Sequence, residues 1–220
     1  MNAKSKQSQV LKPSTDKRAD PRQFRSNKTV DLILKSASEM LMEVGFEKLS
    51  TNVICKRAGL TPPALYRYFP NKYAVLKELG ERLMGTQNEA LEEWILADIS
   101  EENLEMRMLE LLEITMAVTQ ADPASAWIMR SLHASPHLSE VRLNSHRLVS
   151  QALTERFLQI WPEAPRDRIY SQIRLSVEIS YSVVEMLFDD HELDAQTVMK
   201  STAKIITINI KNTLIKPHKK

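Results

Sequence analysis

Side chains that can bind phosphate gather near residue 70. Within residues 51–72, TNVICKRAGLTPPALYRYFPNK, they are Tyr66, Arg67, Tyr68 and Lys72. The segment has the pattern of two short helices joined by a turn at Gly59. Such a pair binds DNA by placing its second helix in the major groove, while the first crosses the backbone. The segment therefore predicts a nucleic-acid partner.

A longer helix must precede this pair and give it a core. Apolar residues recur at helical spacing after Ser26, which predicts a helix of about 18 residues. Gly45 stands where a left-handed residue would end this helix. Ser50 or Thr51 can then cap the second helix.

The third helix is predicted to begin at Thr61, which can cap it. Pro62 and Pro63 fall in its first turn, where backbone N–H groups have no partner within the helix. The helix must end before Pro70, so it is short. The only cysteine, Cys55, lies on the apolar face of the second helix and is expected in the core, because no partner for a nucleophile is near it.

The composition predicts a soluble, all-α protein. The chain has 220 residues with only four glycines, a hydrophobic share of 43% and a charged share of 26%. No apolar run approaches the roughly 20 residues that span a bilayer, and the start of the chain lacks the apolar centre of a signal peptide. A single cysteine fits a reducing compartment, so a cytoplasmic protein without membrane contact is expected.

Charge divides the chain into a basic and an acidic part. Residues 1–72 hold 14 Lys and Arg against 6 Asp and Glu, whereas residues 73–220 hold 16 against 22. This asymmetry is typical of a nucleic-acid-binding domain carried by a different domain.

Three regions follow from these patterns. Residues 1–26 form a basic arm, expected to be disordered, that is either a passive tail or a contact to phosphates or the minor groove. Residues 27–72 form the helix-turn-helix domain, with its motif at 50–69. Residues 73–220 form a larger helical domain for ligand binding and dimerisation.

The larger domain is predicted to consist of helices with brief breaks, which gives about nine helices in the whole chain. Their expected ranges are 72–98, 101–120, 123–135, 136–160, 165–188 and 194–214. The last has a β-branched run but no strand to pair with, so a helix is favoured. The helix before it is apolar nearly all round, which predicts burial against a second subunit as well as the core.

The helix-turn-helix segment resembles the DNA-binding domain of the tetracycline-repressor (TetR) family. The residues that match the family pattern are Ala58, Gly59, Leu60, Thr61, Leu65, Tyr66, Tyr68, Phe69 and Lys72. Gly45 and Phe46 also match a glycine-aromatic pair of the family. The resemblance covers about residues 28–75, and the rest of the chain is similar only in being helical and of suitable length.

The resemblance implies a set of DNA-binding residues. They are Thr51, Asn52, Thr61, Pro62, Pro63, Ala64, Tyr66, Arg67, Tyr68 and Lys72. The first two open the second helix and match positions that touch phosphate or a base edge. The next four match the tip of the recognition helix, the tyrosines match phosphate contacts, and the lysine starts the connecting helix.

The tip departs from many relatives of this family. Pro62, Pro63 and Ala64 offer no side-chain hydrogen bonds, so contact with thymine methyl groups would carry part of the readout. Asn52 or Arg67 would then reach a purine.

The two tyrosines have an alternative interpretation, which is that they belong partly to the core. Of the two, Tyr68 is expected to be the more exposed.

Other patterns give no evidence of catalysis or of a cofactor. His133 and His137 have a metal-ligand spacing, but Pro136 interrupts the helix and no third ligand is evident. No glycine-rich phosphate loop or nucleophile elbow is present, so neither an enzyme nor a metal site is expected.

Two features of the larger domain allow two interpretations each. Arg174 and Glu178 form either an internal salt bridge or the polar end of a pocket. Several adaptable apolar residues line either a cavity or an ordinary core. These are Met84, Met106, Met108, Met116, Met129, Trp94, Trp127 and Phe157.

The resemblance implies a homodimeric transcriptional regulator that represses from a near-palindromic operator. Dimerisation is expected through the last two helices, about 165–189 and 194–214, and release through a small, apolar ligand in the larger domain. One alternative is a dimeric DNA-binding regulator without ligand control. A second is a helical ligand carrier or enzyme with a vestigial helix-turn-helix.

Overall fold

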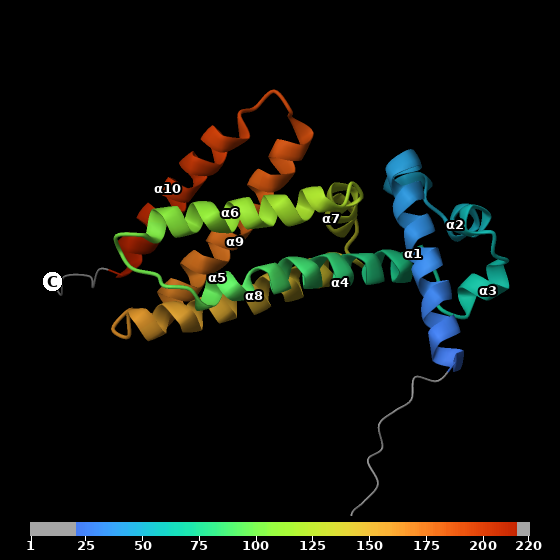
Figure 1. Cartoon of the computed structure of the whole chain (residues 1–220), viewed down its shortest axis with the longest axis horizontal. Coiled ribbons are helices and arrows are strands. Elements are labelled where there is room, and N and C mark those ends of the chain that lie inside the picture. Colours follow the sequence, from blue (N-terminus) through green and yellow to red (C-terminus); the bar gives the residue numbers. More distant parts are fainter. Residues whose placement is uncertain (1–20, 215–220) are drawn as a thin grey trace, which may run out of the picture.

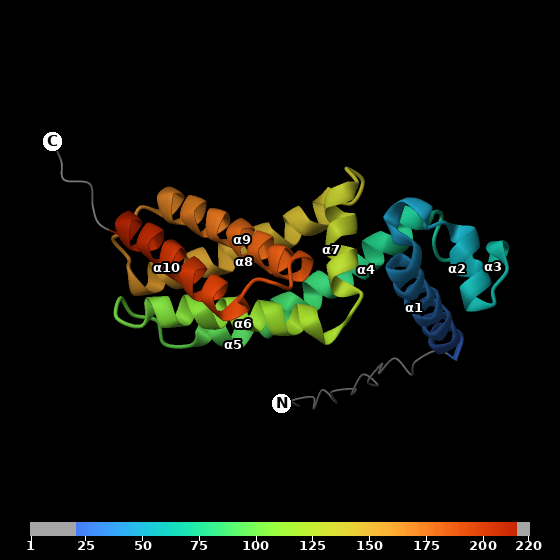
Figure 2. The ribbon, with the colours of Figure 1, turned by 90° about the horizontal axis from the view of Figure 1, so that it is seen from above.

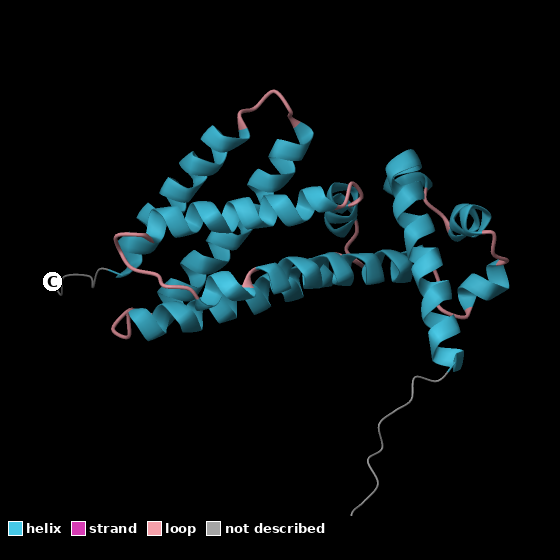
Figure 3. Ribbon diagram, in the orientation of Figure 1, coloured by secondary structure: helices cyan, strands magenta, loops and turns pink. Residues whose placement is uncertain are grey.

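The computed structural model describes residues 21–214, and the side chains of residues 27–214. All regular structure in this range is helical, so the predicted all-α class is confirmed (Figure 1, Figure 3). The helices are α1 Pro21–Lys48, α2 Thr51–Ala58, α3 Pro62–Tyr66, α4 Lys72–Ala90, α5 Glu92–Leu96, α6 Leu104–Ala121, α7 Ser125–Ala134, α8 Ser139–Ile160, α9 Arg166–Asp189 and α10 Ala195–Leu214.

Helices α1–α3, here called the head, lie at one end of the molecule, and helices α4–α10, here called the body, form the rest (Figure 1, Figure 2). Helix α4 runs from the head into the body and is continuous across the predicted boundary at residue 72. Helices α9 and α10 lie far from α2 and α3 (Figure 2). Residues 1–20 of the predicted arm lie outside the described range, and α1 begins at Pro21, before the expected start at Ser26.

The structure has one helix more than the predicted nine within residues 21–214, because the expected helix over 72–98 is divided. Leu91 separates α4 from α5, and its N–H bonds the carbonyl of Asn88, three residues earlier, at 3.1 Å. This tighter turn changes the direction of the chain. The predicted helix in the last segment is confirmed as α10.

Gly45 bends α1 near its end, because its φ of 74° is one that residues with a Cβ rarely adopt. The bend turns Phe46 back against the core of the head, and Leu49 behind it is 1% exposed. The prediction placed the end of the helix at this glycine, whereas the helical turns resume for three residues beyond it.

Helix α4 passes closest to its neighbours at Gly80. A Cβ built at this residue would lie 2.7 Å from Cδ2 of Leu132 on α7 and 3.2 Å from Cγ1 of Val141 on α8. Leu132 is 1% exposed and has little room to move. The absent side chain therefore lets three helices approach each other.

A hydrogen-bonded polar chain crosses the interior of the body. The buried Gln87 of α4 donates from Nε2 to Oγ1 of Thr119 at 3.0 Å and accepts from the Tyr181 hydroxyl at 3.0 Å. The next residue of α4, Asn88, accepts from the Ser145 hydroxyl at 3.0 Å. These bonds join α4 to α6, α8 and α9, and they satisfy groups that would be costly to bury alone.

Glu178 of α9, one helical turn before Tyr181, lies among three basic side chains. Arg142 Nη1 lies 3.0 and 3.1 Å from its two carboxylate oxygens, Arg174 Nη2 lies 2.5 Å away and His146 Nδ1 lies 3.2 Å away. Arg174 and Glu178 are thus part of an ion-pair cluster that also includes α8. The fully buried His146 ring stacks on Tyr181, with centroids 4.3 Å apart.

Most of the adaptable residues are ordinary core. Among the described residues the buried ones are Met84, Met108, Met116, Met129, Trp94 and Phe157. Met106 and Trp127 are on the surface, with exposed fractions of 55% and 37%.

We predict opposite effects of the same substitution at two glycines of α4. Gly80→Ala should lower the free energy of unfolding by about 1–2 kcal/mol, because the strain of overpacking exceeds the gain in helix propensity. Gly85→Ala is the matched control, since a Cβ there meets nothing within 4 Å, and it should raise stability by about 0.5–1 kcal/mol. Urea unfolding at fixed protein concentration measures both. Equal effects at the two sites would contradict the close helix contact.

We also predict that stability falls as the pH falls below about 6.5. Burial lowers the pKa of His146 to about 4, although the carboxylate of Glu178 opposes this shift. Between about pH 6.5 and 4 the unfolded chain binds a proton that the folded chain does not, so folding loses at most about 3 kcal/mol over this window.

A second loss should follow at lower pH. Burial alone would raise the pKa of Glu178, but hydrogen bonds from Arg174 and His146 outweigh the effect of burial and lower the pKa to about 2. This stabilisation is present above the ordinary carboxyl pKa and is lost as the pH falls toward 2.

Urea titrations from pH 7.5 to 4 test the first of these two losses, which belongs to His146. His146→Gln should remove the loss of stability in this window, and an unchanged dependence of stability on pH would contradict the assignment to His146.

Candidate nucleic-acid interface

Helices α2 and α3 are held at a fixed angle by local backbone features. The Ser50 hydroxyl accepts a hydrogen bond from the N–H of Val53 at 3.3 Å, so Ser50 rather than Thr51 caps α2. Gly59 ends α2 in the left-handed conformation, with a φ of 64°. Leu65 of α3 is fully buried and fixes that helix to the head.

The tip of α3 projects into solvent. Thr61, Pro62 and Pro63 are exposed, and Ala64 is half-buried. Thr61 stands at the expected cap position, but its hydroxyl makes no capping bond. The tip therefore presents one hydroxyl, two pyrrolidine rings and a methyl group, and its prolines offer no N–H.

The hydroxyl of Tyr66 joins the two helices at the surface. It lies 3.1 Å from Oγ1 of Thr51, although the two residues are fifteen positions apart. Tyr66 is 50% exposed, so its hydroxyl can still accept or donate a second hydrogen bond. The first turn of α2 and the last residue of α3 thus present adjoining hydroxyl groups, beside the exposed Asn52.

The expectation that Tyr68 would be the more exposed tyrosine is wrong. Tyr68 is half-buried and packs against the core of the head, whereas Tyr66 is exposed. The cause is that α3 ends at Tyr66, after which the N–H of Tyr68 bonds the carbonyl of Leu65 at 2.9 Å. This turn directs Tyr68 inward and leaves Arg67 exposed.

Lys72 holds the start of α4 against the end of α1. Its Nζ donates to the carbonyl oxygen of Phe46 at 3.1 Å and lies 4.7 Å from the centroid of the Phe46 ring. The Tyr73 ring lies 5.7 Å from the same nitrogen. Lys72 is half-buried, so its ammonium satisfies a carbonyl at a helix end and is stabilised by two aromatic faces.

Arg57 is a positioning residue that the sequence patterns did not indicate. It forms ion pairs with Glu39, at 3.3 Å, and with Glu43, and both partners lie on α1. In the sequence, the only indication of this contact is that the two glutamates are one helical turn apart, so that both can face one basic side chain on a neighbouring helix. These pairs help to fix α2 against α1.

Three further side chains that could do chemistry have structural contacts instead. Cys55 is buried, as expected, and burial raises the pKa of its thiol. His133 Nδ1 lies 3.1 Å from Glu185, whereas the His137 ring lies beside Tyr73, with centroids 5.2 Å apart. The described residues 27–214 contain no group of three or more acidic, histidine or cysteine side chains placed to hold a metal ion.

Comparison with known proteins identifies the head. Residues 33–79 match the family described as bacterial regulatory proteins, tetR family. This segment is therefore a domain of the TetR family. The match covers most of α1, all of α2 and α3 and the start of α4.

The sequence of this chain is similar to curated relatives over only a part of each. It is 39% identical over 54 residues to the tetracycline repressor protein class C of Escherichia coli, which is 24% of this chain and 25% of that one. It is 31% identical over 87 residues to the nucleoid occlusion factor SlmA of Glaesserella parasuis, or 40% of this chain and 41% of that one. The matches thus span less than half the length of these relatives.

Solved structures resemble nearly the whole fold. The fatty acid degradation regulator FadR from Bacillus halodurans has a TM-score of 0.64 and 20% identity, with 81% of this chain and 94% of that one covered. FadR from Bacillus subtilis in complex with stearoyl-CoA has a TM-score of 0.62 and 18% identity, with 82% and 98% covered. At such identities the likeness concerns the fold.

Within residues 21–214, none of the helices has the length and apolarity that a bilayer-spanning segment needs.

Proposed function

We propose that this protein is a homodimeric DNA-binding transcriptional regulator that represses and is released by a small ligand. The observation that carries the proposal is the exposed Tyr66–Thr51 hydroxyl pair, which lies within the part of the chain that matches the family. Two hydroxyls held together at a basic surface suit one DNA phosphate.

Phosphate contacts set the register of the head on DNA. The hydroxyls of Thr51 and Tyr66 approach the backbone, and the excess of 14 basic over 6 acidic residues in positions 1–72 attracts it. Lys72 and Tyr68 stabilise the head, because both pack against it. Their contacts with phosphate would lie at the edge of the DNA-binding surface.

Base readout is divided between an apolar tip and two polar side chains. Pro62, Pro63 and Ala64 suit the methyl group of thymine, and Thr61 adds one free hydroxyl. Asn52 of α2 and Arg67, which follows α3, are both exposed and can reach a purine. Two heads on one dimer would read a near-palindromic operator.

The dimer surface is assigned to α9 and α10. Leu175 and Met186 on α9 are 49% and 41% exposed, and Ile205 and Ile208 on α10 are 54% and 48% exposed. Each pair is spaced so that it falls on one side of its helix. Four large apolar side chains on adjoining helices form a surface that a second subunit would cover.

Ligand control is proposed to act through α4. This helix meets the head at Lys72 and the buried polar chain of the body at Gln87 and Asn88. A ligand that favours another position of α4 would change the spacing of the two heads. A typical coupling of this kind is about 1–3 kcal/mol.

We predict that Tyr66→Phe weakens operator binding about tenfold to thirtyfold. Each dimer would lose two hydroxyl–phosphate bonds of about 1 kcal/mol each, while the ring and its packing remain. Gel-shift titration on an operator selected in vitro by the wild-type protein measures the effect. Tyr170→Phe on α9 is the matched control and should bind as the wild type does. Equal affinity of all three proteins would contradict the assignment of the head surface.

We predict that Ile205→Glu converts the dimer to a monomer. The substitution places a carboxylate from each subunit in the apolar interface, and burial of an unpaired charge there should weaken dimerisation at least about a hundredfold. Leu148→Glu on α8 is the control, since Leu148 is 58% exposed and lies outside the proposed surface. Sedimentation velocity distinguishes the two. A dimer of unchanged strength in Ile205→Glu would mean that the interface lies elsewhere.

A further inference from the structure

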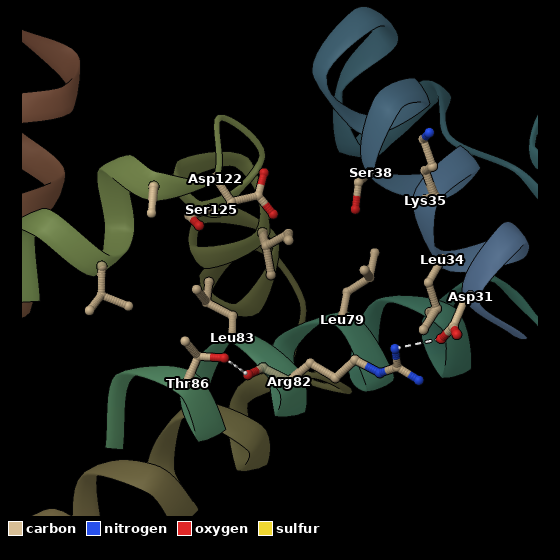
Figure 4. Close-up of a pocket in the computed structure, with 13 residues that line it drawn as sticks. Asp31, Leu34, Lys35, Ser38, Leu79, Arg82, Leu83, Thr86, Asp122 and Ser125 are labelled. Atoms are coloured by element: carbon tan, nitrogen blue, oxygen red, sulfur yellow. Dashed lines mark hydrogen bonds and ion pairs between the residues drawn. The ribbon is translucent and has the colours of Figure 1, made fainter. Parts of the chain in front are cut away.

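A cleft of about 490 Å³ lies between the head and the body, where α1 faces α4, the end of α6 and the start of α7 (Figure 4). Its apolar wall comes from all four helices and consists of Leu34, Leu79, Leu83, Val118, Ala121 and Ile128. The volume falls within the range of sites for small organic molecules, and such sites are mostly apolar with few polar groups.

Two polar groups at the start of α7 are available to a ligand in this cleft. Ser125 lines the cleft and is fully buried, yet its hydroxyl has no hydrogen-bond partner. Asp122 lies in the same turn, where one carboxylate oxygen accepts the N–H of Ala124 at 2.9 Å. Among the described residues Asp122 forms no ion pair, and it stands across the opening from Ser38 of α1 (Figure 4).

The charges around the cleft favour a cation. The guanidinium of Arg82 is shared by two carboxylates, Asp31 at 2.8 Å and Glu78 at 2.9 Å, so these three residues carry one net negative charge. Asp122 adds a second, and the exposed Lys35 offsets one of them. An organic anion would have to compete with two carboxylates for Arg82 and would otherwise meet only the exposed Lys35. An ammonium group would meet the Asp122 carboxylate, which forms no ion pair among the described residues.

We propose that this cleft is an effector site for an apolar molecule with a single amine. The apolar body would lie against Leu79, Leu83 and Ile128, and the ammonium would bind the Asp122 carboxylate and the Ser125 hydroxyl. This assignment rests on the proposed function for its consequence, which is release from DNA, but the binding itself does not depend on DNA.

The position of the cleft explains how such a ligand acts on the heads. The Asp31–Arg82 pair crosses from α1 to α4 along one edge of the cleft (Figure 4). A molecule between α1 and α7 changes the distance between the head and the body directly, so it favours one position of the head relative to α4.

Three probes with one rigid apolar body test the charge preference. These are 1-aminoadamantane, adamantan-1-ol and adamantane-1-carboxylate, titrated into the full-length protein by calorimetry without DNA. The amine should bind at least about tenfold more tightly than the carboxylate, with the alcohol between them. In Asp122→Asn, whose amide oxygen can still accept the N–H of Ala124, the amine should lose this advantage.

Two alanines of α6 provide a matched test of the location. Ala121 lines the cleft, whereas Ala117 lies one turn earlier, is also exposed and does not line it. Ala121→Leu should weaken binding of the amine at least about tenfold by filling the cleft, and Ala117→Leu should leave it unchanged. Equal binding of amine and carboxylate, no binding of the amine, or full binding to Ala121→Leu would each overturn the site.

Operator binding tests the consequence. Saturating 1-aminoadamantane should weaken operator binding at least about fivefold in the wild type and Ala117→Leu, but not in Ala121→Leu. Binding of the amine in the cleft with unchanged operator affinity would overturn its role as an effector site while the proposed function stands. A wild-type protein that binds no DNA even without the amine would contradict the proposed function and leave the calorimetric result intact.

Discussion

Hydrogen bonds of the Gln87 side chain to two hydroxyl groups fix the helix on which the arrangement of this molecule depends. Gln87 is 2% exposed, and its amide is held between the hydroxyls of Thr119 and Tyr181 at 3.0 Å each. An amide in this position has no water to replace a lost partner, so any movement of α4 along its axis breaks bonds at the full cost of a buried polar group. Helix α4 therefore has a preferred position in the body rather than a range of positions.

The opposite end of α4 is fixed by a different kind of contact. Lys72 bonds the Phe46 carbonyl and lies over the Phe46 ring, so the head follows the first turn of α4. The bend at Gly45 is what brings Phe46 to this place. A displacement of α4 in the body thus reaches the head through this pair, as well as through the Asp31–Arg82 pair. The Tyr66–Thr51 surface moves with the head as a unit because Leu65 is buried beneath it.

Much of the head could be predicted from the sequence, because its structure is specified by neighbouring residues. The starts and ends of its short helices are set by Ser50, Gly59 and the prolines of α3, each of which affects only the adjoining helical turn. Their roles follow from residue type. The bond between Thr51 and Tyr66 joins residues fifteen positions apart, and the burial of Tyr68 depends on where α3 ends. In the body, Gln87 reads as a surface residue until the partners on α6 and α9 are known. The cleft has no sequence signal, since its walls come from four helices that meet only in the folded chain.

The strengths of these contacts indicate where the molecule can yield. Within the body, α4 is held by buried hydrogen bonds, each costly to leave unpaired. Across the cleft, one polar link between α1 and α4 is the Asp31–Arg82 pair, whose side chains are 60% and 50% exposed. Exposed pairs contribute about 0–1 kcal/mol, so this pair contributes little compared with the buried hydrogen bonds inside the body. A ligand in the cleft therefore acts beside an exposed ion pair, whereas a movement of α4 within the body would have to break the buried Gln87 bonds. The cleft between the head and the body is therefore the place where a weakly bound small molecule can change the position of the head without repacking the core.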